Sequence, residues 1–384
     1  MKTTGDQQLV KRINRSVLLR LLRAQSGLSR AQLAQASGLT KSTVSLLVRE
    51  LMDEGWLAET GVTPASGQGR PSTPLHIDGT TRGLIGVEVA VEALRVVGIS
   101  LTGEVLWSVE EPLADTTPGG VCQQAAQLVA QACVQFTKRH LRLTGIGIGL
   151  PGAFDDATGV LRFAPNLGWR NVDFVPLITQ ALSEAGVPDV PVHVQNEADT
   201  AALSEYEFSP GDAKDSLIFV SCGAGVGAGI VLNDRLFTGA QGMAGEIGHS
   251  ILQVDGALCS CGRHGCAETF FGARALARLP QPAHGGRYLG VVLQNLWTTF
   301  NPSVLVVGGP TCVRYPAIVE VAQQSLQAYA DSAGMATPTL RAARFGLLAS
   351  AVGAAALVLH HALRPMHERS PAPGMSATRA ADGF

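Results

Sequence analysis

The chain has 384 residues, 46% of them hydrophobic and 5% aromatic, with 44 glycines and a formal net charge of −2. This length allows two or three domains with their own cores, and the glycine-rich, aromatic-poor composition favours an α/β protein. No apolar stretch reaches the roughly 18 residues of a membrane span and the N-terminus has no apolar signal core, so we expect a cytoplasmic protein without a membrane partner. Residues 345–363 come closest to a span, but Ser350 and Gly353 interrupt them, which favours a buried helix.

Charge is unevenly distributed along the chain. Residues 1–49 contain nine Lys or Arg and one acid, Asp6, a net charge of +8, so the remainder carries −10. A basic segment ahead of an acidic one indicates that nucleic acid would contact only the first segment. A helix face that is simply exposed to solvent could carry the same charge. The helix pattern described next favours the nucleic-acid interpretation.

The first segment has the pattern of three short helices. Apolar residues recur at helical spacing over 7–25, which predicts the first helix. Ser29 is a good N-cap for a second helix over 30–37, and a turn at Gly38 leads into a third helix over 41–54. A short helix, a glycine-containing turn and a helix that opens with polar residues form a helix-turn-helix, whose last helix enters the major groove of DNA.

The residues expected to contact DNA lie on and around this last helix. Its exposed first turn would face base edges and phosphates, and a Gly-flanked Arg-Pro loop follows it, as in the wing of a winged helix. The alternative for residues 61–74 is a flexible linker. Both interpretations can hold, because a wing can also connect the DNA-binding domain to the rest of the chain. We therefore place the DNA-binding domain at 1–62 and the wing or linker at 63–80. The predicted DNA-binding residues are Arg30, Lys41, Ser42, Thr43, Ser45, Arg49 and, in the loop, Arg70.

From Gly83 onward, strand-like runs alternate with longer helices. Two β-rich α/β lobes that face each other across a ligand-binding cleft are the expected assembly. This body would span 81–364, followed by a disordered tail at 365–384 that is rich in small residues and proline. The expected strands are 84–89, 94–99, 104–107, 145–150, 217–222 and 228–232, and the expected long helix is 120–140.

His249, Cys259, Cys261 and Cys266 form a Cys₃His set with the spacing of a zinc site. A disulfide framework is not expected in a long, unsecreted chain, and the other four cysteines stand singly in apolar surroundings. Zn²⁺ takes such ligands tetrahedrally, so we predict a structural zinc ion that stiffens this loop. Three buried thiols without metal are the alternative for the cluster, and His264 is the alternative to His249.

Five motifs stand out in the body: Leu150-Pro151-Gly152, Ala164-Pro165-Asn166-Leu167-Gly168-Trp169, Gln195-Asn196-Glu197-Ala198-Asp199, Gly245-Glu246-Ile247-Gly248-His249 and Cys259-x-Cys261-Gly-x-x-Gly-Cys266-x-Glu268. They resemble those of the ROK family, which contains sugar-responsive repressors and sugar kinases. The resemblance covers nearly the whole chain and favours the repressor branch, in the style of xylose-type repressors, because a winged helix-turn-helix precedes the body. It implies an α/β protein with an N-terminal winged helix-turn-helix followed by a two-lobed, actin-like ATPase (ribonuclease H-like) body. The cysteine motif is highly specific, whereas Leu-Pro-Gly alone would mean little.

The resemblance also implies a sugar-binding pocket. Carboxylates and amides suit vicinal hydroxyls, and His249 would ligate zinc through one ring nitrogen and donate to the sugar through the other. A helix cap or Asx-turn is an equal alternative for Asn166 and Asn196, and surface charge is the alternative for Glu246 and Glu268. Glu197 would stand where the kinases place a catalytic Asp. The implied sugar-binding residues are Asn166, Asn196, Glu197, Glu246, His249 and Glu268.

The phosphate-binding loops of the family's kinases are altered in this chain. Ala90, Val91 and Glu92 stand where a ROK kinase has Gly-Gly-Thr, so the backbone is less free to approach phosphate and a negative charge is added. In the second loop, Ala224 replaces a hydroxyl donor. These differences predict that the chain is not an enzyme. The alternative is an ATP-dependent sugar kinase with an appended DNA-binding head.

The patterns together predict a sugar-responsive transcriptional regulator, a repressor of carbohydrate catabolism genes. Its expected partners are a double-stranded DNA operator and a small sugar or sugar derivative. We expect a homodimer or a dimer of dimers, because one winged helix reads few base pairs. A ligand-blind DNA-binding protein is a further alternative. Only 32 residues separate Glu268 from Asn301, and residues 280–286 there have the pattern of a truncated loop.

Overall fold

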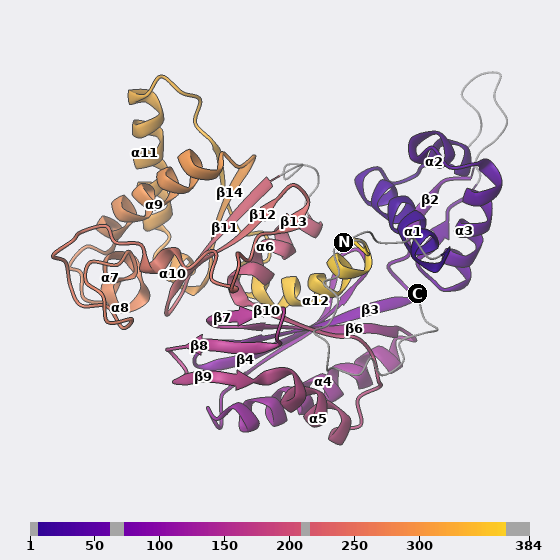
Figure 1. Ribbon diagram of the computed structural model, residues 1–384, viewed down its shortest axis with the longest axis horizontal. Helices are drawn as coiled ribbons and strands as arrows, with labels where there is room; N and C mark the ends of the chain where they lie inside the picture. Colours follow the sequence, from indigo (N-terminus) through magenta and orange to yellow (C-terminus); the bar gives the residue numbers. More distant parts are fainter. Residues whose placement is uncertain (1–6, 62–72, 209–215, 366–384) are drawn as a thin grey trace.

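The structure is a computed structural model that describes residues 7–61, 73–208 and 216–365 (Figure 1). Arg70 and residues 366–384 of the predicted tail lie outside the described residues. Among the described residues, no helix combines the length and the apolar character needed to cross a membrane. We call residues 7–61 and 73–80 the head, and residues 81–208 and 216–365 the body.

The head contains the three predicted helices and a two-stranded antiparallel sheet. Ser29 caps the second helix in a capping box with Gln32, and Gly38 ends it in the left-handed conformation, with a φ of 72°, which glycine adopts most easily. Thr40 caps the third helix by accepting a hydrogen bond from the backbone amide of Thr43. The elements are α1 (Gln7–Ala24), α2 (Arg30–Ser37), α3 (Lys41–Asp53), β1 (Leu57–Glu59) and β2 (Leu75–Ile77).

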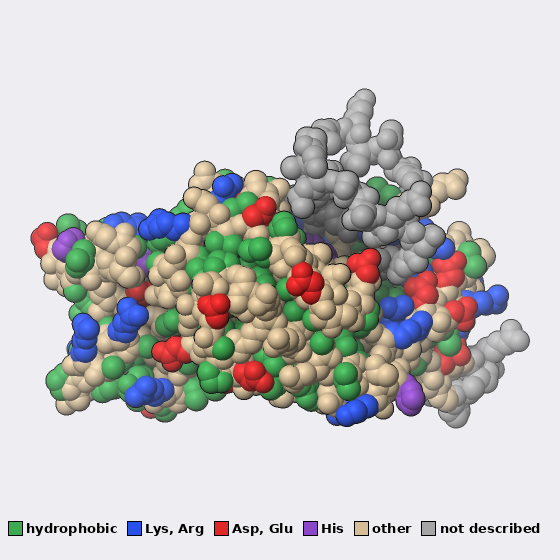
Figure 2. All heavy atoms as spheres, turned by 90° about the horizontal axis from the view of Figure 1, so that it is seen from below, with side chains coloured by type: hydrophobic (Ala, Val, Ile, Leu, Met, Phe, Trp, Pro, Cys, Tyr) green, Lys and Arg blue, Asp and Glu red, His purple; other side chains and the backbone are tan. Residues whose placement is uncertain are grey.

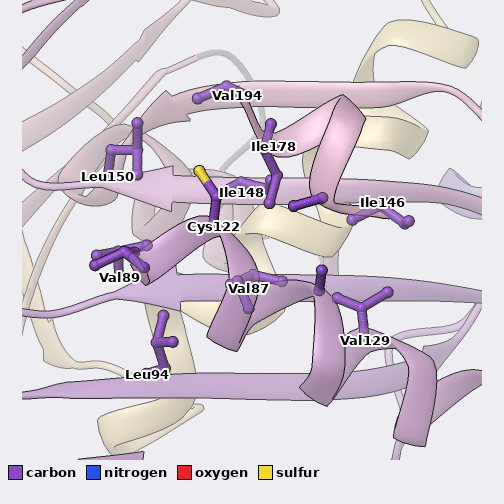
Figure 3. Close-up of a cluster of buried hydrophobic side chains, with 14 of the residues drawn as sticks. Val87, Val89, Leu94, Cys122, Val129, Ile146, Ile148, Leu150, Ile178 and Val194 are labelled. Atoms are coloured by element: carbon purple, nitrogen blue, oxygen red, sulfur yellow. The ribbon is translucent and has the colours of Figure 1, made fainter. Parts of the chain in front are cut away.

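The first lobe of the body is built on a sheet with the strand order β10-β6-β3-β4-β5. Strands β3, β6 and β10 run parallel, and β4 and β5 extend the sheet antiparallel. Helices α4 and α5 cover one face, where Val87, Val89, Ile148 and Ile178 pack in the core shown in Figure 3. The elements are β3 (Arg82–Val89), β4 (Ala93–Ser100), β5 (Val105–Pro112), α4 (Pro118–Lys138), β6 (Arg142–Leu150), α5 (Phe174–Glu184) and β10 (Val192–Asn196).

The second lobe repeats this arrangement with the strand order β13-β12-β11-β14-β15. Its strands β11, β14 and β15 run parallel, β12 is antiparallel to β11, and helices α9 and α11 supply its outer core. The predicted two-lobed body is therefore confirmed. The elements are β11 (Ser216–Cys222), β12 (Val226–Leu232), β13 (Arg235–Leu236), α9 (Gly285–Phe300), β14 (Val304–Gly308), α11 (Ala317–Ser332) and β15 (Thr339–Ala342).

Two helices pack against each other between the sheets, α6 (Glu197–Phe208) and α12 (Ala349–Ala362), as Figure 1 shows. Glycines allow this close approach. A Cβ on Gly353 of α12 would overlap the carbonyl oxygen of Thr200 in α6, and one on Gly147 of β6 would overlap that of Ala354. The buried helix predicted from the apolar run at 345–363 thus joins the two lobes.

Short elements complete the body. A three-stranded antiparallel sheet, β7-β8-β9, follows β6 in the chain. Its strands are β7 (Ala153–Asp155), β8 (Val160–Ala164) and β9 (Trp169–Asp173). The short helices are η1 (Ile247–His249), α7 (Glu268–Phe271), α8 (Ala273–Leu276), η2 (Pro282–His284), α10 (Pro310–Arg314) and η3 (Gly346–Leu348).

Two expectations from the sequence are wrong in detail. The loop predicted over 280–286 instead contains η2, and its two last glycines begin α9. The missing side chain of Gly286 lets α9 pack on α11, since a Cβ there would overlap the carbonyl oxygen of Ile318. The strand predicted over 104–107 runs on to Pro112. Glu110 and Glu111 have the polar character of a loop in the sequence, but β5 is at the edge of its sheet, where charged residues are common.

The head and the body share a buried core. Leu18 of α1, Leu84 of β3 and Leu359 of α12 belong to one hydrophobic cluster. Arg82 of the body adds a polar contact, because its Nε donates to the carbonyl oxygen of Glu54 at 2.7 Å. The head is therefore docked on the body rather than tethered freely.

Much of the positive charge of the head is balanced within the head itself. Acidic and basic side chains lie interspersed at this end of the molecule (Figure 2). Lys11 Nζ lies 2.9 Å from Glu50 Oε1, and Arg15 forms an ion pair with Glu54. The basic charge that remains for DNA is consequently concentrated on fewer residues than the sequence alone indicates.

Candidate functional site

A cavity of about 600 Å³ lies between the two lobes. Its lining comes from the β3–β4 turn, the end of β8, the start of α6, the β11–β12 turn, the segment around η1 and the start of α7. This volume is in the range of small-molecule sites. All the predicted sugar-binding residues line it: Asn166, Asn196, Glu197, Glu246, His249 and Glu268.

Asn196 stands at the start of α6 and has structural partners. Its Oδ1 accepts hydrogen bonds from the amides of Ala198 at 2.7 Å and Asp199 at 3.2 Å, and its Nδ2 donates to the carbonyl oxygen of Gly152 at 2.8 Å. The helix-cap alternative is therefore observed for Asn196, which also borders the cavity. Its cap fixes the helix whose first turn carries the next acidic residues.

The first turn of α6 holds two carboxyl groups with raised pKa values. Burial, reinforced by the charges of Glu246 and Glu88, raises the pKa of Glu197 to about 8. At neutral pH its carboxyl is therefore largely protonated, and can both donate to and accept from a hydroxyl. Asp199 is 3% exposed, and its Oδ1 has no hydrogen-bond partner among the described residues. Burial and the charge of Asp156 raise the pKa of Asp199 well above its ordinary value.

The sequence pattern assigns Asp199 no role, although one of the quoted motifs contains it. An acid in the first turn of a helix is ordinary, because it complements the helix dipole. Only its burial distinguishes Asp199 from such an acid, and burial is not visible in the sequence.

Glu246 and His249 lie on the segment that follows β13. Gly245 has a φ of 91°, and a Cβ there would overlap the carbonyl oxygen of Ala228, so the segment can lie directly on β12. Burial raises the pKa of Glu246, with Glu268 adding to this effect and His249 opposing it. Both predicted residues are thereby held at the cavity wall.

Glu268 begins α7 and is held from two sides. The amide of Val226 donates to its Oε2 at 3.3 Å, and Ser260 Oγ donates to its Oε1 at 3.4 Å. Asn166, two residues after the end of β8, lies near Gly225 on the same side as Glu268. A Cβ on Gly225 would lie 3.2 Å from Glu268 Oε2 and 3.4 Å from Asn166 Nδ2. Glu268 is consequently a cavity residue with fixed geometry rather than a free surface charge.

The four predicted metal ligands are brought together. Their candidate ligand atoms all lie within 4.8 Å of one another, with His249 Nδ1 3.6 Å from Cys259 Sγ and Cys261 Sγ 3.7 Å from Cys266 Sγ. In a tetrahedron with metal–sulfur distances of about 2.3 Å, ligand atoms lie about 3.8 Å apart. The cluster therefore fits a tetrahedral metal ion. His264 points elsewhere, with its Nδ1 3.0 Å from the carbonyl oxygen of Gly256.

The altered loops also line the cavity, with Ala90, Val91 and Glu92 on one side and Ala224 on the other. Some of their backbone amides have protein partners. The amide of Ala90 donates to the carbonyl oxygen of Ala93 at 2.9 Å, and that of Gly223 to Gly225 at 2.8 Å. These amides are therefore not directed at a ligand.

The structure places most, but not all, of the predicted DNA-binding residues on one helix. Five share the third helix, with Lys41, Ser42, Ser45 and Arg49 exposed and Thr43 half-buried. Arg30 is separate, because it forms an ion pair with Glu59 and its Nη2 lies 3.6 Å from Met52 Sδ near the other end of α3. Arg70 lies outside the described residues.

Residues 84–285 match the ROK family, and residues 12–58 match a winged helix-turn-helix DNA-binding domain. The chain belongs to the ROK family. This ROK protein is 29% identical to the xylose repressor of Bacillus subtilis (strain 168), over 94% of the chain and 98% of the relative.

Solved structures of the same fold include a regulator and a kinase. One is a ROK family transcriptional regulator, a homologue of the E. coli MLC protein. The match includes 93% of this ROK protein and 98% of the regulator, with a TM-score of 0.73 and 24% sequence identity. The other is a ROK family glucokinase from Streptomyces griseus, solved with glucose and AMPPNP. The match includes 72% of this ROK protein and 98% of the glucokinase, with a TM-score of 0.62 and 25% sequence identity. The predicted family and fold are confirmed, and the body alone does not separate regulators from kinases.

Proposed function

We propose that this ROK protein is a sugar-responsive, DNA-binding transcriptional repressor of carbohydrate catabolism genes. One observation carries the proposal: a winged helix-turn-helix is docked on a body whose candidate sugar-binding residues all line a single cavity. The similarity to the xylose repressor of Bacillus subtilis along nearly the whole chain supports it.

The proposed DNA partner is a double-stranded operator. Lys41 and Arg49 on the exposed face of α3 would contact phosphates, and Ser42, Thr43 and Ser45 would meet base edges in the major groove. A two-fold operator needs two such helices about 34–36 Å apart, so we propose a homodimer or a dimer of dimers.

The proposed effector is a small sugar or sugar derivative in the cavity. Its hydroxyls would be held by the amide of Asn166 and by the carboxyl groups of Glu197, Glu246 and Glu268, and a buried site of this kind rejects analogues that lack a hydroxyl. An effector that prefers one arrangement of the lobes shifts the equilibrium between two states of the protein, and the docked head would follow that shift.

The proposed metal in the Cys₃His cluster is a structural Zn²⁺. Three sulfur ligands and one imidazole are the donor set that zinc prefers. The ion would tie His249 to the loop that ends at Glu268, so that two cavity residues keep their positions. It supplies rigidity, and the hydrogen bonds to the effector come from the side chains.

No kinase activity is proposed. Phosphoryl transfer depends on a phosphate cradle and on charge stabilisation, and Ala90, Val91, Glu92 and Ala224 replace the groups that would supply the cradle. An ATP-dependent sugar kinase is the second candidate, favoured by the fold that this chain shares with the Streptomyces griseus glucokinase. A coupled ADP-release assay over common hexoses and pentoses separates the two, because sustained turnover would support the kinase.

The experiment that tests the proposed function joins three measurements on one sample. Zinc is quantified, the melting temperature is followed across a panel of hexoses and pentoses, and the affinity for DNA duplexes selected from a random library is measured with and without each sugar. We expect at least one sugar to raise the melting temperature and to change DNA affinity. DNA binding that no sugar affects would instead indicate a ligand-blind DNA-binding protein.

A further inference from the structure

The lining of the cavity includes a row of three charged residues, Glu88, Arg95 and Glu110, which we call the charged triad. The strand register places them side by side, because Glu88 on β3 is directly opposite Arg95 on β4, and Arg95 is directly opposite Glu110 on β5. Residues that are directly opposite on neighbouring strands are close enough for their side chains to interact. All three residues line the cavity.

Both glutamates of the charged triad form ion pairs with the guanidinium group of Arg95. Its Nη1 lies 3.2 Å from Glu88 Oε2, and its Nε lies 2.8 Å from Glu110 Oε2. Arg95 is 8% exposed and Glu88 is 9% exposed, whereas the side chain of Glu110 is 53% exposed. The one cation is thus shared between two carboxyl groups, and the formal net charge of the triad is −1.

The rest of the cavity offers little compensation for a further negative charge. Apart from Arg95, the one guanidinium group among the lining residues that the structure describes is that of exposed Arg314, which lies 5.5 Å from the ring centroid of Tyr315. Six glutamates line the cavity: Glu88, Glu92, Glu110, Glu197, Glu246 and Glu268. Glu197 adds little charge, because its carboxyl is largely protonated at neutral pH. The ionised carboxylates among the six can accept hydrogen bonds from hydroxyl groups and would repel a phosphate dianion.

We propose that the charged triad is a specificity determinant that restricts the effector to uncharged carbohydrates and rejects their phosphate esters. This inference rests on the proposed function, since it concerns the effector of the same cavity. Arg95 is the natural anion-binding group of this part of the cavity, and Glu88 and Glu110 pair with its Nη1 and Nε. Removal of one or both carboxylates would free a guanidinium group for a phosphate.

The test uses the full chain with its zinc and compares Glu110→Gln, Glu88→Gln/Glu110→Gln and a matched control, Glu111→Gln. Glu111 is the next residue of β5, but alternation along the strand turns its side chain away from Arg95, and it does not line the cavity. The single variant changes only the half-exposed partner, so a folding defect in the double variant leaves the test intact. The probes are inorganic phosphate, hexoses and pentoses, and the phosphate esters of those sugars, titrated by calorimetry.

For every neutral sugar that binds the wild type, we expect its phosphate ester to bind at least about tenfold more weakly. We expect Glu110→Gln to bind phosphate at least about tenfold more tightly than the wild type, and Glu111→Gln to match the wild type, since one like charge near an anion costs about this factor or more. A wild type that binds an ester as tightly as its parent sugar would overturn the proposal, as would equal phosphate affinities of the Glu110 and Glu111 variants. If no neutral sugar binds at all, the proposed effector class fails, whereas the phosphate titrations still judge the triad.

Discussion

Arg23 of the head lies 3.2 Å from Glu207 at the end of α6, measured from Nη2 to Oε2. Glu207 is buried, and its Oε1 lies 2.7 Å from His360 Nδ1 and 2.7 Å from Arg364 Nη1. Burial alone would raise the pKa of Glu207, but Arg364, His360 and Arg23 hold it well below its usual range. Because α6 begins at the cavity and carries Glu207 in its last turn, one helix joins the candidate effector site to the head.

This connection predicts that Arg23→Gln uncouples the head from the cavity. Loss of a buried charge partner should cost about 1–3 kcal/mol of unfolding free energy. The variant should still bind DNA, but an effector sugar should change its DNA affinity several-fold less than that of the wild type. Fluorescence anisotropy with a labelled operator, with and without the sugar, measures both quantities.

The matched control for Arg23→Gln is Lys11→Gln. This change removes the same charge from the same helix, but Lys11 pairs with Glu50 inside the head. It should leave the sugar response unchanged. A full sugar response in Arg23→Gln would show that the Arg23–Glu207 ion pair is not needed for coupling.

The raised pKa of Glu197 predicts a pH-dependent stability. Its folded-state pKa of about 8 lies above the ordinary value of 4.5, so the folded state binds more protons than the unfolded state between these values. Its contribution to the free energy of unfolding therefore falls as the pH rises from 4.5 to 8. Glu197→Gln lacks this penalty, and should gain about 1–3 kcal/mol relative to the wild type across that interval.

Thermal denaturation at several pH values from 5 to 9 checks this expectation. Glu104→Gln, which removes an exposed carboxylate near β5, is the control. A stability difference between Glu197→Gln and the wild type that does not change with pH would contradict the raised pKa of Glu197.

The metal cluster predicts one bound zinc ion per chain. Cys261→Ser should lose the ion and roughly 2–5 kcal/mol of stability, because the loop around η1 and α7 loses its central crosslink. Cys133→Ser changes a half-buried thiol outside the cluster and should keep the zinc. Metal analysis and denaturant unfolding measure the two effects. If zinc-free Cys261→Ser still responds fully to the sugar, the metal loop stabilises the cavity without taking part in coupling.

The exposed face of α3 predicts a DNA-binding pattern. Lys41→Ala and Arg49→Ala should each weaken binding about five- to tenfold on all sequences and reduce the slope of log affinity against log salt by about one. Ser45→Ala should instead act on some base pairs and not on others. Lys138→Ala, at the exposed end of α4, is the control. Unchanged salt slopes for both α3 variants would argue against phosphate contacts from this helix.

Local features of the sequence were sufficient for the elements of the head. Ser29, Gly38 and Thr40 set the helix ends by contacts within a few residues, so their pattern can be recognised in the chain. The metal cluster was equally accessible, because three of its ligands lie within eight residues and such spacing is specific. The sugar-site candidates came instead from the motifs of a family, and the cavity that they line agrees with that interpretation.

Relationships between distant residues were decided by the tertiary structure alone. Glu88, Arg95 and Glu110 meet because three strands align in one register, and Arg23 meets Glu207 across 184 positions of the chain. The burial that raises the pKa of Asp199 likewise depends on its surroundings in the fold. Short-range capping and cysteine spacing are properties of neighbouring residues, so the sequence by itself determined the helices of the head, the four candidate metal ligands and the family. Charge pairing and desolvation depend on which distant surfaces come together, so only the folded chain could decide them.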